Sequence, residues 1–212
     1  AASDVYKRQI INNNVVILSI VVIFEEIKFS ANVAILGIDL VEGGEERADS
    51  VEKALARVKP EADFIAIHDA ARPCIADEWI GTIFDACVKS GAALPGIPVA
   101  GTLKRAEQEN NGSYMVAETV DRTSLWEAQT PQVFRRDWLL QAYAQRDGFF
   151  ATDDAQLVER AGHPVTLLEG SPLNRKITTR QDLKLAAQIL KILPKPKVGG
   201  TGNPFADDDL FR

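Results

Sequence analysis

Short apolar runs alternate with segments of helical periodicity along most of this chain, from Asn32 onward. The runs end at glycine, proline or charged residues, as buried strands do, whereas the segments between them repeat their apolar residues at helical spacing. This alternation predicts an α/β fold with helices on both faces of a mostly parallel sheet. The predicted strands span residues 33–41, 64–68, 92–99, 130–134, 165–168 and 176–178. The predicted helices span residues 47–58, 77–90, 138–145, 153–161 and 180–193.

Local signals indicate where several helices begin and end. Asp77 is the expected N-cap of the second helix, and Gly91 follows its last residue, where a left-handed conformation ends many helices. Thr179 and Asp182 form a variant of the capping box, with Asp in place of Glu, at the start of the last helix. Pro194 ends that helix because proline cannot continue the hydrogen-bond ladder.

An insertion interrupts the alternation after the third predicted strand. Pro95 and Pro98 make that strand irregular or place it partly at a sheet edge, because proline cannot donate to a strand ladder. Asn111-Gly112 is a strong hairpin signal, and it lies between two extended segments, residues 102–106 and 114–120. We expect an arm of about residues 101–122 that projects from the domain and either makes a dimer contact or covers a site.

The composition is that of an ordinary globular protein. The chain has 212 residues, 46% of them hydrophobic and 25% charged, which suffices for one substantial core. Its formal net charge of -6 and its pI near 5.1 argue against a broad basic surface for nucleic acid. Basic residues must therefore gather locally wherever an anionic substrate binds.

The cysteines and histidines indicate no zinc site. Cys74 and Cys87 do not form a Cys-x-x-Cys motif, and only His68 and His163 accompany them. Reduced thiols in a cytoplasmic protein fit this pattern best. We expect Cys74 to be a small packed thiol, and His68 to be satisfied by backbone groups at the end of a strand.

The beginning of the chain does not follow the pattern of the rest. The apolar run 15–24 is broken by Ser19 and is shorter than the ~20 residues that a membrane-spanning helix needs, and the export-signal pattern is weak. An abrupt change of composition after Gln9 suggests a fragment boundary or a non-native stretch. We therefore predict an atypical or non-native N-terminal segment, a globular domain and a flexible tail, at residues 1–31, 32–193 and 194–212.

The second predicted strand runs directly into Asp69-Ala70-Ala71-Arg72-Pro73. Ligands of open α/β sheets lie against the loops that leave the carboxyl ends of the strands. A carboxylate can meet a metal ion or a hydroxyl there, while a guanidinium forks onto phosphate oxygens. The sequence therefore predicts a site for a magnesium-bound, phosphate-bearing ligand at this loop.

Several motifs in a fixed order carry a family resemblance. They are Gly43-Gly44-Glu45-Glu46-Arg47-Ala48-Asp49-Ser50-Val51, His68-Asp69-Ala70-Ala71-Arg72-Pro73, Val120-Asp121-Arg122, Thr130-Pro131-Gln132 and Lys176-Ile177-Thr178. In this order the chain closely resembles the 2-C-methyl-D-erythritol 4-phosphate cytidylyltransferases of the non-mevalonate isoprenoid pathway. The resemblance covers roughly residues 32–193. It implies a Rossmann-like nucleotidyltransferase fold and a homodimer joined through the hairpin arm.

The resemblance also implies roles for individual residues. The positions that bind the nucleotide match Gly43, Gly44, Glu45, Ser50, Asp69 and Ala70. The positions around the second substrate match Asp69, Arg72, Thr102, Thr130 and Thr152. Arg122 and Lys176 match positions that align the substrates for catalysis, and Asp69 is the candidate ligand of a Mg²⁺ cofactor. In the family, the equivalents of Thr102 and Arg122 reach the site from a partner subunit.

The implied reaction is attack by the phosphate oxygen of methylerythritol phosphate on the α-phosphorus of CTP, with release of pyrophosphate. That oxygen is already anionic, so the protein must mainly align the substrates and neutralise charge. The family also carries an N-terminal Gly-rich loop with an Arg and a Lys that cradles the triphosphate, and nothing in residues 1–32 resembles it. We therefore expect this chain, as given, to be nearly inactive.

Other functions remain open at this point. A pentitol-phosphate cytidylyltransferase would share the nucleotide loop and differ at the second substrate. A non-catalytic nucleotide-binding or dimerisation remnant would account for the missing triphosphate loop. A sugar-nucleotide transferase that uses UTP or GTP is disfavoured by the motif set.

Overall fold

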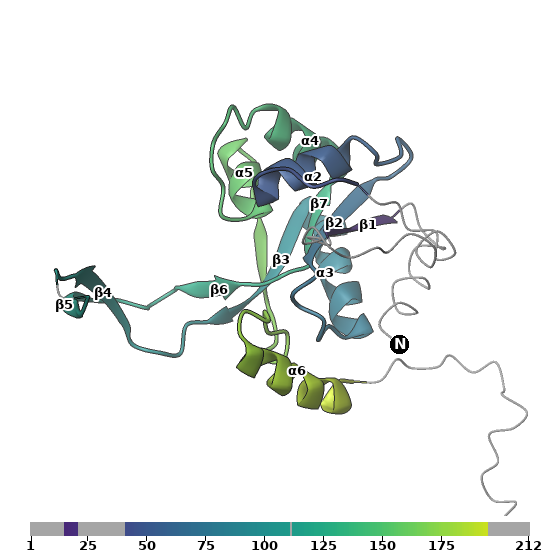
Figure 1. Cartoon of the computed structure of the whole chain (residues 1–212). Helices are drawn as coiled ribbons and strands as arrows, with labels where there is room; N and C mark the ends of the chain where they lie inside the picture. Colours follow the sequence, from purple (N-terminus) through teal and green to yellow (C-terminus); the bar gives the residue numbers. More distant parts are fainter. Residues whose placement is uncertain (1–14, 21–40, 111, 195–212) are drawn as a thin grey trace, which may run out of the picture.

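A computed structural model describes residues 15–20, 41–110 and 112–194 (Figure 1). In this part of the chain a six-stranded sheet has the order β1 (Val15–Ile20), β2 (Phe64–Asp69), β7 (Gln132–Arg135), β3 (Ala92–Pro98) and β6 (Trp126–Ala128), with β8 (Thr166–Glu169) also paired to β3. The β1–β2 and β3–β8 pairs are parallel, whereas β7 is antiparallel to both β2 and β3. The α/β class is confirmed, and among the described strands the sheet is mixed. The chain returns from the arm in the opposite direction, which accounts for the antiparallel pairs of β6 and β7.

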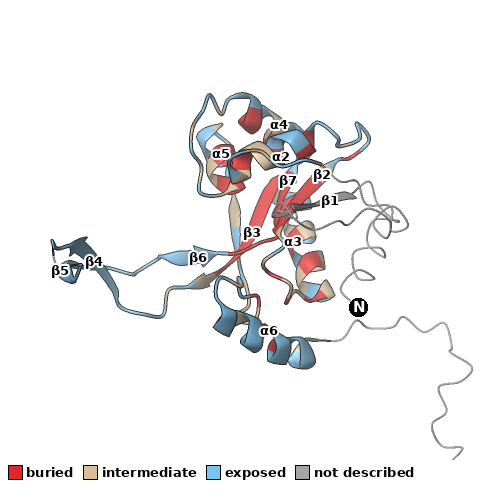
Figure 2. Cartoon of the chain, in the orientation of Figure 1, coloured by how far each residue is buried: buried red, intermediate tan, exposed pale blue. Residues whose placement is uncertain are grey.

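Helices cover both faces of the sheet. One layer contains α2 (Arg47–Leu55), α4 (Arg136–Ala144) and α5 (Asp154–Arg160), and the other contains α3 (Asp77–Ser90). The strand alternation determines which residue meets which layer. Ile65 and Ile67 of β2 pack with the first layer, whereas Ala66 between them packs with Ile83 and Cys87 of α3. The buried core therefore follows the sheet on both of its faces (Figure 2).

The last helix, α6 (Arg180–Ile192), packs its buried residues Ala186 and Ile189 against Cys74. Its capping box is confirmed, because Thr179 and Asp182 exchange side-chain and backbone hydrogen bonds. Burial raises the pKa of the Cys74 thiol, and this thiol is fully buried, which confirms that it is a packed side chain.

Most of the predicted helices and strands are confirmed within a few residues, but the predicted N-cap of α3 and the predicted strand 176–178 are wrong. Asp77 is the first residue of α3, and Ala76 is its N-cap. The prediction that β3 lies partly at an edge holds at its end, because β8 pairs with it only over residues 93–96 and Ile97 and Pro98 pair with β6 alone. Residues 176–178 form no strand; Ile177 N instead makes a single hydrogen bond of 2.7 Å to Ala71 O.

Some predictions concern residues outside the described ranges. The predicted strand 33–41 lies there except for Val41, which is not in a strand, and so does the tail after Pro194. Of the apolar run 15–24, the described part is strand β1, which pairs with β2 from Val15–Phe64 to Ile20–Asp69. Within the described residues, no helix combines the length and the apolar content that crossing a bilayer requires.

The hairpin is confirmed and projects from the domain as an arm (Figure 1). It consists of β4 (Leu103–Gln108) and β5 (Tyr114–Val120), paired antiparallel with an irregularity between Arg105 and Ala106. Nearly all of its residues are exposed, including Tyr114, Met115 and Val116 (Figure 2). An arm with exposed apolar side chains gains little stability from its own chain, which is typical of a segment that packs against another molecule.

Gly91 is required where α3 turns into β3. Its φ of 90° lies in the left-handed region, and a Cβ at this position would overlap the Trp138 ring. We predict that Gly91→Ala lowers the free energy of unfolding by about 2–4 kcal/mol, from backbone strain together with overpacking. Gly101→Ala is the matched control, because its Cβ would meet open space. Urea unfolding of both variants checks this prediction, and a Gly91→Ala protein as stable as Gly101→Ala would contradict it.

Candidate active site

Asp69, the last residue of β2, collects three cationic side chains. Lys176 Nζ donates to Asp69 Oδ2 at 2.9 Å, and Arg72 Nε lies 3.9 Å from the same oxygen. Arg47 Nε donates to Asp69 Oδ1 at 3.4 Å. We call these four residues the Asp69 centre. They come from α2, from the end of β2 and from the segment before α6, so three distant parts of the sequence meet here.

The Asp69 carboxylate is held in its ionised form. Burial by itself would raise its pKa, but the hydrogen bond from Lys176 and the positive charges of Arg47 and Arg72 outweigh burial, and the pKa lies below its ordinary value. With the side chain only 15% exposed, this carboxylate is a fixed negative anchor for the surrounding cations.

Arg72 is fixed more firmly than the other two cations. It is only 7% exposed, and its Nη1 donates to Asn174 O at 2.9 Å while Nη2 donates to Ala128 O at 3.3 Å. Two carbonyls on separate segments thus set the plane of the guanidinium. A planar group held in this way is pre-organised to present its remaining N–H groups in one direction.

Arg47 links the Asp69 centre to a buried carboxylate that the sequence interpretation missed. Its Nη2 donates to Asp154 Oδ2 at 2.7 Å, and the hydroxyl of Tyr143 donates to Asp154 Oδ1 at 2.6 Å. Asp154 has no exposed surface, so both bonds replace the water that this carboxylate has lost. Burial raises the pKa of Tyr143, which keeps the hydroxyl protonated as the donor. In the sequence, the one indication of a buried acidic partner was Arg47, which lies within the Gly43 to Val51 motif.

The glycine loop before α2 is closed by Ser50. Ser50 Oγ accepts a hydrogen bond from Gly44 N at 2.9 Å and donates to Glu46 O at 3.2 Å. A Cβ on Gly44 would overlap the side chain of Asp49, so the loop can approach the helix this closely only with glycine. Glu45 is exposed beside it. Arg47 lies two residues after Glu45 and contacts Asp69, so its side chain connects the glycine loop with the Asp69 centre.

His68 and Thr130 form a buried support beneath Asp69. Asp69 N donates to Thr130 Oγ1 at 3.0 Å, and this oxygen lies 2.9 Å from His68 Nδ1. His68 Nε2 lies 2.9 Å from Arg72 O, which can only accept, so Nε2 carries the proton and Nδ1 accepts from the Thr130 hydroxyl. His68 is thus a neutral structural residue, as the sequence indicated.

The burial of His68 has a consequence for stability. Burial lowers its pKa, although the nearby Asp69 carboxylate opposes this, so the unfolded chain takes up a proton at higher pH than the folded protein does. Stability from this group is present above the unfolded pKa of about 6.5 and is lost as the pH falls through the folded pKa.

We therefore predict that the free energy of unfolding falls as the pH drops from 7 towards 5, and that His68→Gln flattens this slope. Urea unfolding across that pH range measures it. The chain has two histidines, and His163→Gln, which keeps His68, is the control expected to retain the slope. An unchanged slope in His68→Gln would contradict the prediction.

The described chain does not bring every expected site residue to Asp69. Thr130 lies against it, and Ala70 follows it on the exposed loop. Thr152 lies two residues before Asp154, where its N–H and hydroxyl both donate to Gln156 Oε1. Thr102 and Arg122, by contrast, are exposed residues that flank the strands of the arm. A place on the arm, away from the Asp69 centre of their own chain, is what a role in the site of a partner subunit would require.

The centre can bind anions, and it offers few ligands for a metal. Three cations face Asp69 and Asp154, so the five groups carry a local charge of 3 − 2 = +1 within an acidic chain. Among the described residues, no three His, Cys, Asp or Glu side chains gather as metal ligands. Mg²⁺ commonly binds through one or two carboxylates together with substrate phosphates, so Asp69 alone is compatible with it only in that manner.

Comparisons with known proteins identify the family. The family model of 2-C-methyl-D-erythritol 4-phosphate cytidylyltransferase matches residues 8–192. The enzyme of that name from Acidobacterium capsulatum is 46% identical over 155 residues, which cover 72% of this chain and 64% of the relative. The one from Shouchella clausii is 45% identical over 154 residues, covering 72% of this chain and 65% of the relative. The chain thus spans slightly less than two thirds of the length of these relatives.

Solved structures give the same result. The crystal structure of the cytidylyltransferase from Thermus thermophilus aligns with a TM-score of 0.71 and 32% identity, covering 90% of this chain and 88% of that one. The Francisella tularensis structure aligns with a TM-score of 0.70 and 26% identity, with the same coverage. The fold, the order of the motifs and the match over most of the chain lead to one conclusion: this chain belongs to the 2-C-methyl-D-erythritol 4-phosphate cytidylyltransferase family.

Proposed function

We propose that this protein transfers the cytidylyl group of CTP to 2-C-methyl-D-erythritol 4-phosphate, giving 4-diphosphocytidyl-2-C-methyl-D-erythritol and pyrophosphate for isoprenoid precursor synthesis. The observation that carries the proposal is the Asp69 centre. It offers a buried guanidinium, Arg72, and a more exposed ammonium, Lys176, around one anchored carboxylate at the carboxyl end of β2. The glycine loop lies within the reach of Arg47 from this centre.

The chemistry requires little proton transfer. A phosphate oxygen of the polyol phosphate forms a bond to the α-phosphorus of CTP, and the bond from that phosphorus to the bridging oxygen breaks as pyrophosphate leaves. The attacking oxygen is already anionic, so Arg72 and Lys176 act by holding the two anions together and neutralising their charge. Gly43, Gly44, Glu45 and Ser50 receive the cytosine in this proposal, and Asp69 and Ala70 receive the ribose.

The remaining assignments are also part of the proposal. Mg²⁺ would be held by Asp69 together with nucleotide phosphates and would neutralise phosphate charge when bound. Thr130 and Thr152 border the second substrate. Thr102 and Arg122 would reach the site of a partner subunit in a homodimer, for which the exposed apolar arm provides the surface. Two buried cysteines without a disulfide support a cytoplasmic location.

The test is a single-turnover reaction with the protein in excess over CTP labelled at its α-phosphate. We expect the label to move to a product that forms only when methylerythritol phosphate is present. The same assay with CTP in excess over the protein measures the rate of repeated turnover, which we expect to be low because residues 1–32 do not resemble the Gly-rich loop of the family. Product from ribitol 5-phosphate alone would favour a pentitol-phosphate enzyme. CTP binding with no product would favour a non-catalytic remnant.

A further inference from the structure

Two buried glutamines lie close together where the chain passes from β6 into β7. Gln129 follows β6 and is 2% exposed, and Gln132 begins β7 and is 1% exposed. Burying a primary amide costs free energy unless its donor and acceptor atoms find partners. The partners of these two amides lie on different segments of the chain, and each segment carries a group that holds an arginine of the Asp69 centre.

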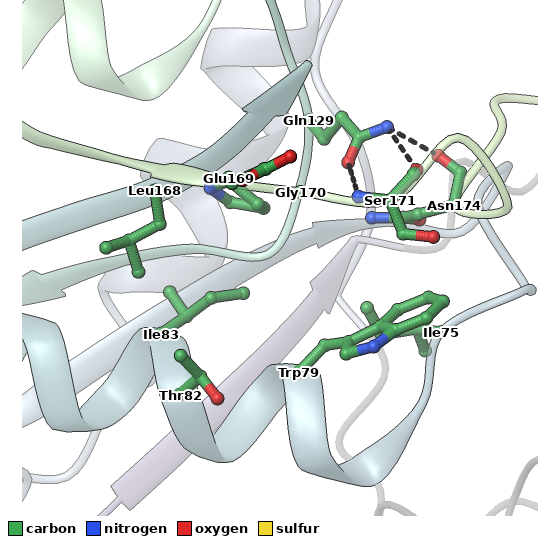
Figure 3. A pocket seen from close by; sticks show the side chains of 11 residues that line it. Ile75, Trp79, Thr82, Ile83, Gln129, Leu168, Glu169, Gly170, Ser171 and Asn174 are labelled. Atoms are coloured by element: carbon green, nitrogen blue, oxygen red, sulfur yellow. Dashed lines mark hydrogen bonds between the residues drawn. The ribbon is translucent and has the colours of Figure 1, made fainter. Parts of the chain in front are cut away.

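Gln129 holds the loop that follows β8 (Figure 3). Its Nε2 donates to Ser171 O at 2.9 Å and to Asn174 O at 3.3 Å, and its Oε1 accepts from Ser171 N at 3.3 Å. The loop passes so close that a Cβ on Gly170 would overlap Gln129 Oε1. Asn174 O is also one of the two carbonyls that accept from the Arg72 guanidinium. Gln129 therefore fixes a carbonyl that directs Arg72.

Gln132 holds the start of α5 on both sides of Asp154. Its Nε2 donates to Asp153 Oδ2 at 2.8 Å, and its Oε1 accepts from Ala155 N at 3.0 Å. The residues immediately before and after Asp154 are thus tied to one side chain, which restrains the carboxylate between them. Asp154 in turn accepts from Arg47 Nη2 at 2.7 Å, a typical length for a charge-assisted hydrogen bond. Gln132 therefore fixes the carboxylate that directs Arg47.

Asp69 holds the two arginines less firmly than these partners do. Arg47 Nε lies 3.4 Å from Asp69 Oδ1, and Arg72 Nε lies 3.9 Å from Oδ2, both longer than a typical hydrogen bond. Thr130, between the two glutamines, accepts from the backbone N–H of Asp69 at 3.0 Å. The segment 129–132 therefore contacts Asp69 itself and the two groups that direct the arginines.

We propose that Gln129 and Gln132 are two separate positioning residues of the Asp69 centre. Gln129 directs the Arg72 guanidinium through a carbonyl, and Gln132 directs the Arg47 guanidinium through a carboxylate. The two routes share no residue, so disturbing one glutamine should leave the other arginine in place. The directions of the arginines do not depend on the proposed function, whereas the consequence for the substrates rests on it.

The test follows the Nε–H resonances of Arg72 and Arg47 in a proton–nitrogen correlation spectrum of the ligand-free protein, assigned with Arg72→Lys and Arg47→Lys. We expect Gln129→Met to shift the Arg72 signal and to leave the Arg47 signal in place. Gln132→Met should do the reverse. Methionine keeps the length of the side chain and removes the amide. A general loss of stability would not separate the two signals in opposite ways.

Under the proposed function, the two variants should also differ in the substrate that they bind less well. Calorimetry with Mg²⁺ measures the affinity for each substrate. We expect Gln129→Met to weaken binding of methylerythritol phosphate about tenfold, and Gln132→Met to weaken binding of CTP by about the same factor. If the parent protein bound neither substrate, the proposed function would be wrong, whereas the arginine signals would still decide the roles of the two glutamines.

Gln188→Met is the control, because Gln188 is an exposed residue of α6 that accepts from Lys191. Neither arginine signal should move in this variant. Gln129→Asn and Gln132→Asn retract the amide by one methylene; they should give the same crossed pattern, and they replace a methionine variant that does not fold. The proposal is overturned if the variants of both glutamines shift the two arginine signals alike, or if they shift neither.

Discussion

Asparagine in place of Asp69 is expected to lower kcat/KM of the transfer reaction by about 10²–10³-fold, the scale for loss of one pre-organised charged group. Asn keeps the shape of the side chain but removes the charge that Lys176, Arg47 and Arg72 share. Lys176 and Arg72 then lose their carboxylate partner, Arg47 keeps only Asp154, and the direction of Lys176 is no longer fixed. Steady-state and single-turnover rates measure this effect.

Asp69→Asn should also lower the free energy of unfolding. Loss of the charge-assisted hydrogen bonds is expected to cost about 1–3 kcal/mol near neutral pH. The folded pKa of Asp69 is depressed, so its contribution is present above the unfolded pKa of about 4 and is lost as the pH falls through the folded pKa. Parent and variant should therefore converge in stability below about pH 4.

Asp63→Asn is the matched control for these measurements. Asp63 is exposed and lies immediately before β2, so it tests the loss of a carboxylate charge at the other end of the same strand. We expect Asp63→Asn to change neither the rate nor the stability appreciably. Equal losses in the two variants would show that Asp69 has no special role.

Lysine in place of Arg72 is the second substitution with a large expected effect. An ammonium cannot bond both the Asn174 and the Ala128 carbonyl in the plane of a guanidinium, so the direction of the charge is no longer fixed. We predict that kcat/KM for the polyol phosphate falls about 10²-fold, with a smaller effect on CTP affinity measured by calorimetry.

Arg57→Lys provides the comparison for Arg72→Lys, because Arg57 is an exposed arginine beyond the end of α2. It should behave like the parent protein. If Arg72→Lys kept the parent kcat/KM for the polyol phosphate, the assignment of Arg72 to that substrate would be wrong. If Arg72→Lys lowered only the affinity for CTP, Arg72 would instead be assigned to the nucleotide.

Much of the fold could be predicted because its signals are local. The Asn111-Gly112 turn, the left-handed Gly91 and the Thr179–Asp182 capping box each act within a few residues, and the structure contains all three elements that they indicate. The short strand β6 was not predicted, since its three residues are all exposed and carry no alternation.

The contacts of the candidate site were harder to predict because they join distant segments. Asp69 and Arg72 could be predicted as site residues because they directly follow an apolar strand in the sequence. The role of Asp154 depends on Arg47, 107 residues earlier, and on the Tyr143 hydroxyl. The clamp on Arg72 consists of backbone carbonyls, which no side-chain pattern in the sequence can indicate.

The most direct test of the central claim is a phosphorus NMR spectrum of the protein with CTP, Mg²⁺ and 2-C-methyl-D-erythritol 4-phosphate. We predict that the phosphomonoester signal of the polyol phosphate decays while two coupled diphosphate signals and pyrophosphate appear in equal amounts. The same sample with Asp69→Asn should change far more slowly. An unchanged phosphomonoester signal with excess parent protein, or hydrolysis of CTP to CMP alone, would contradict the account.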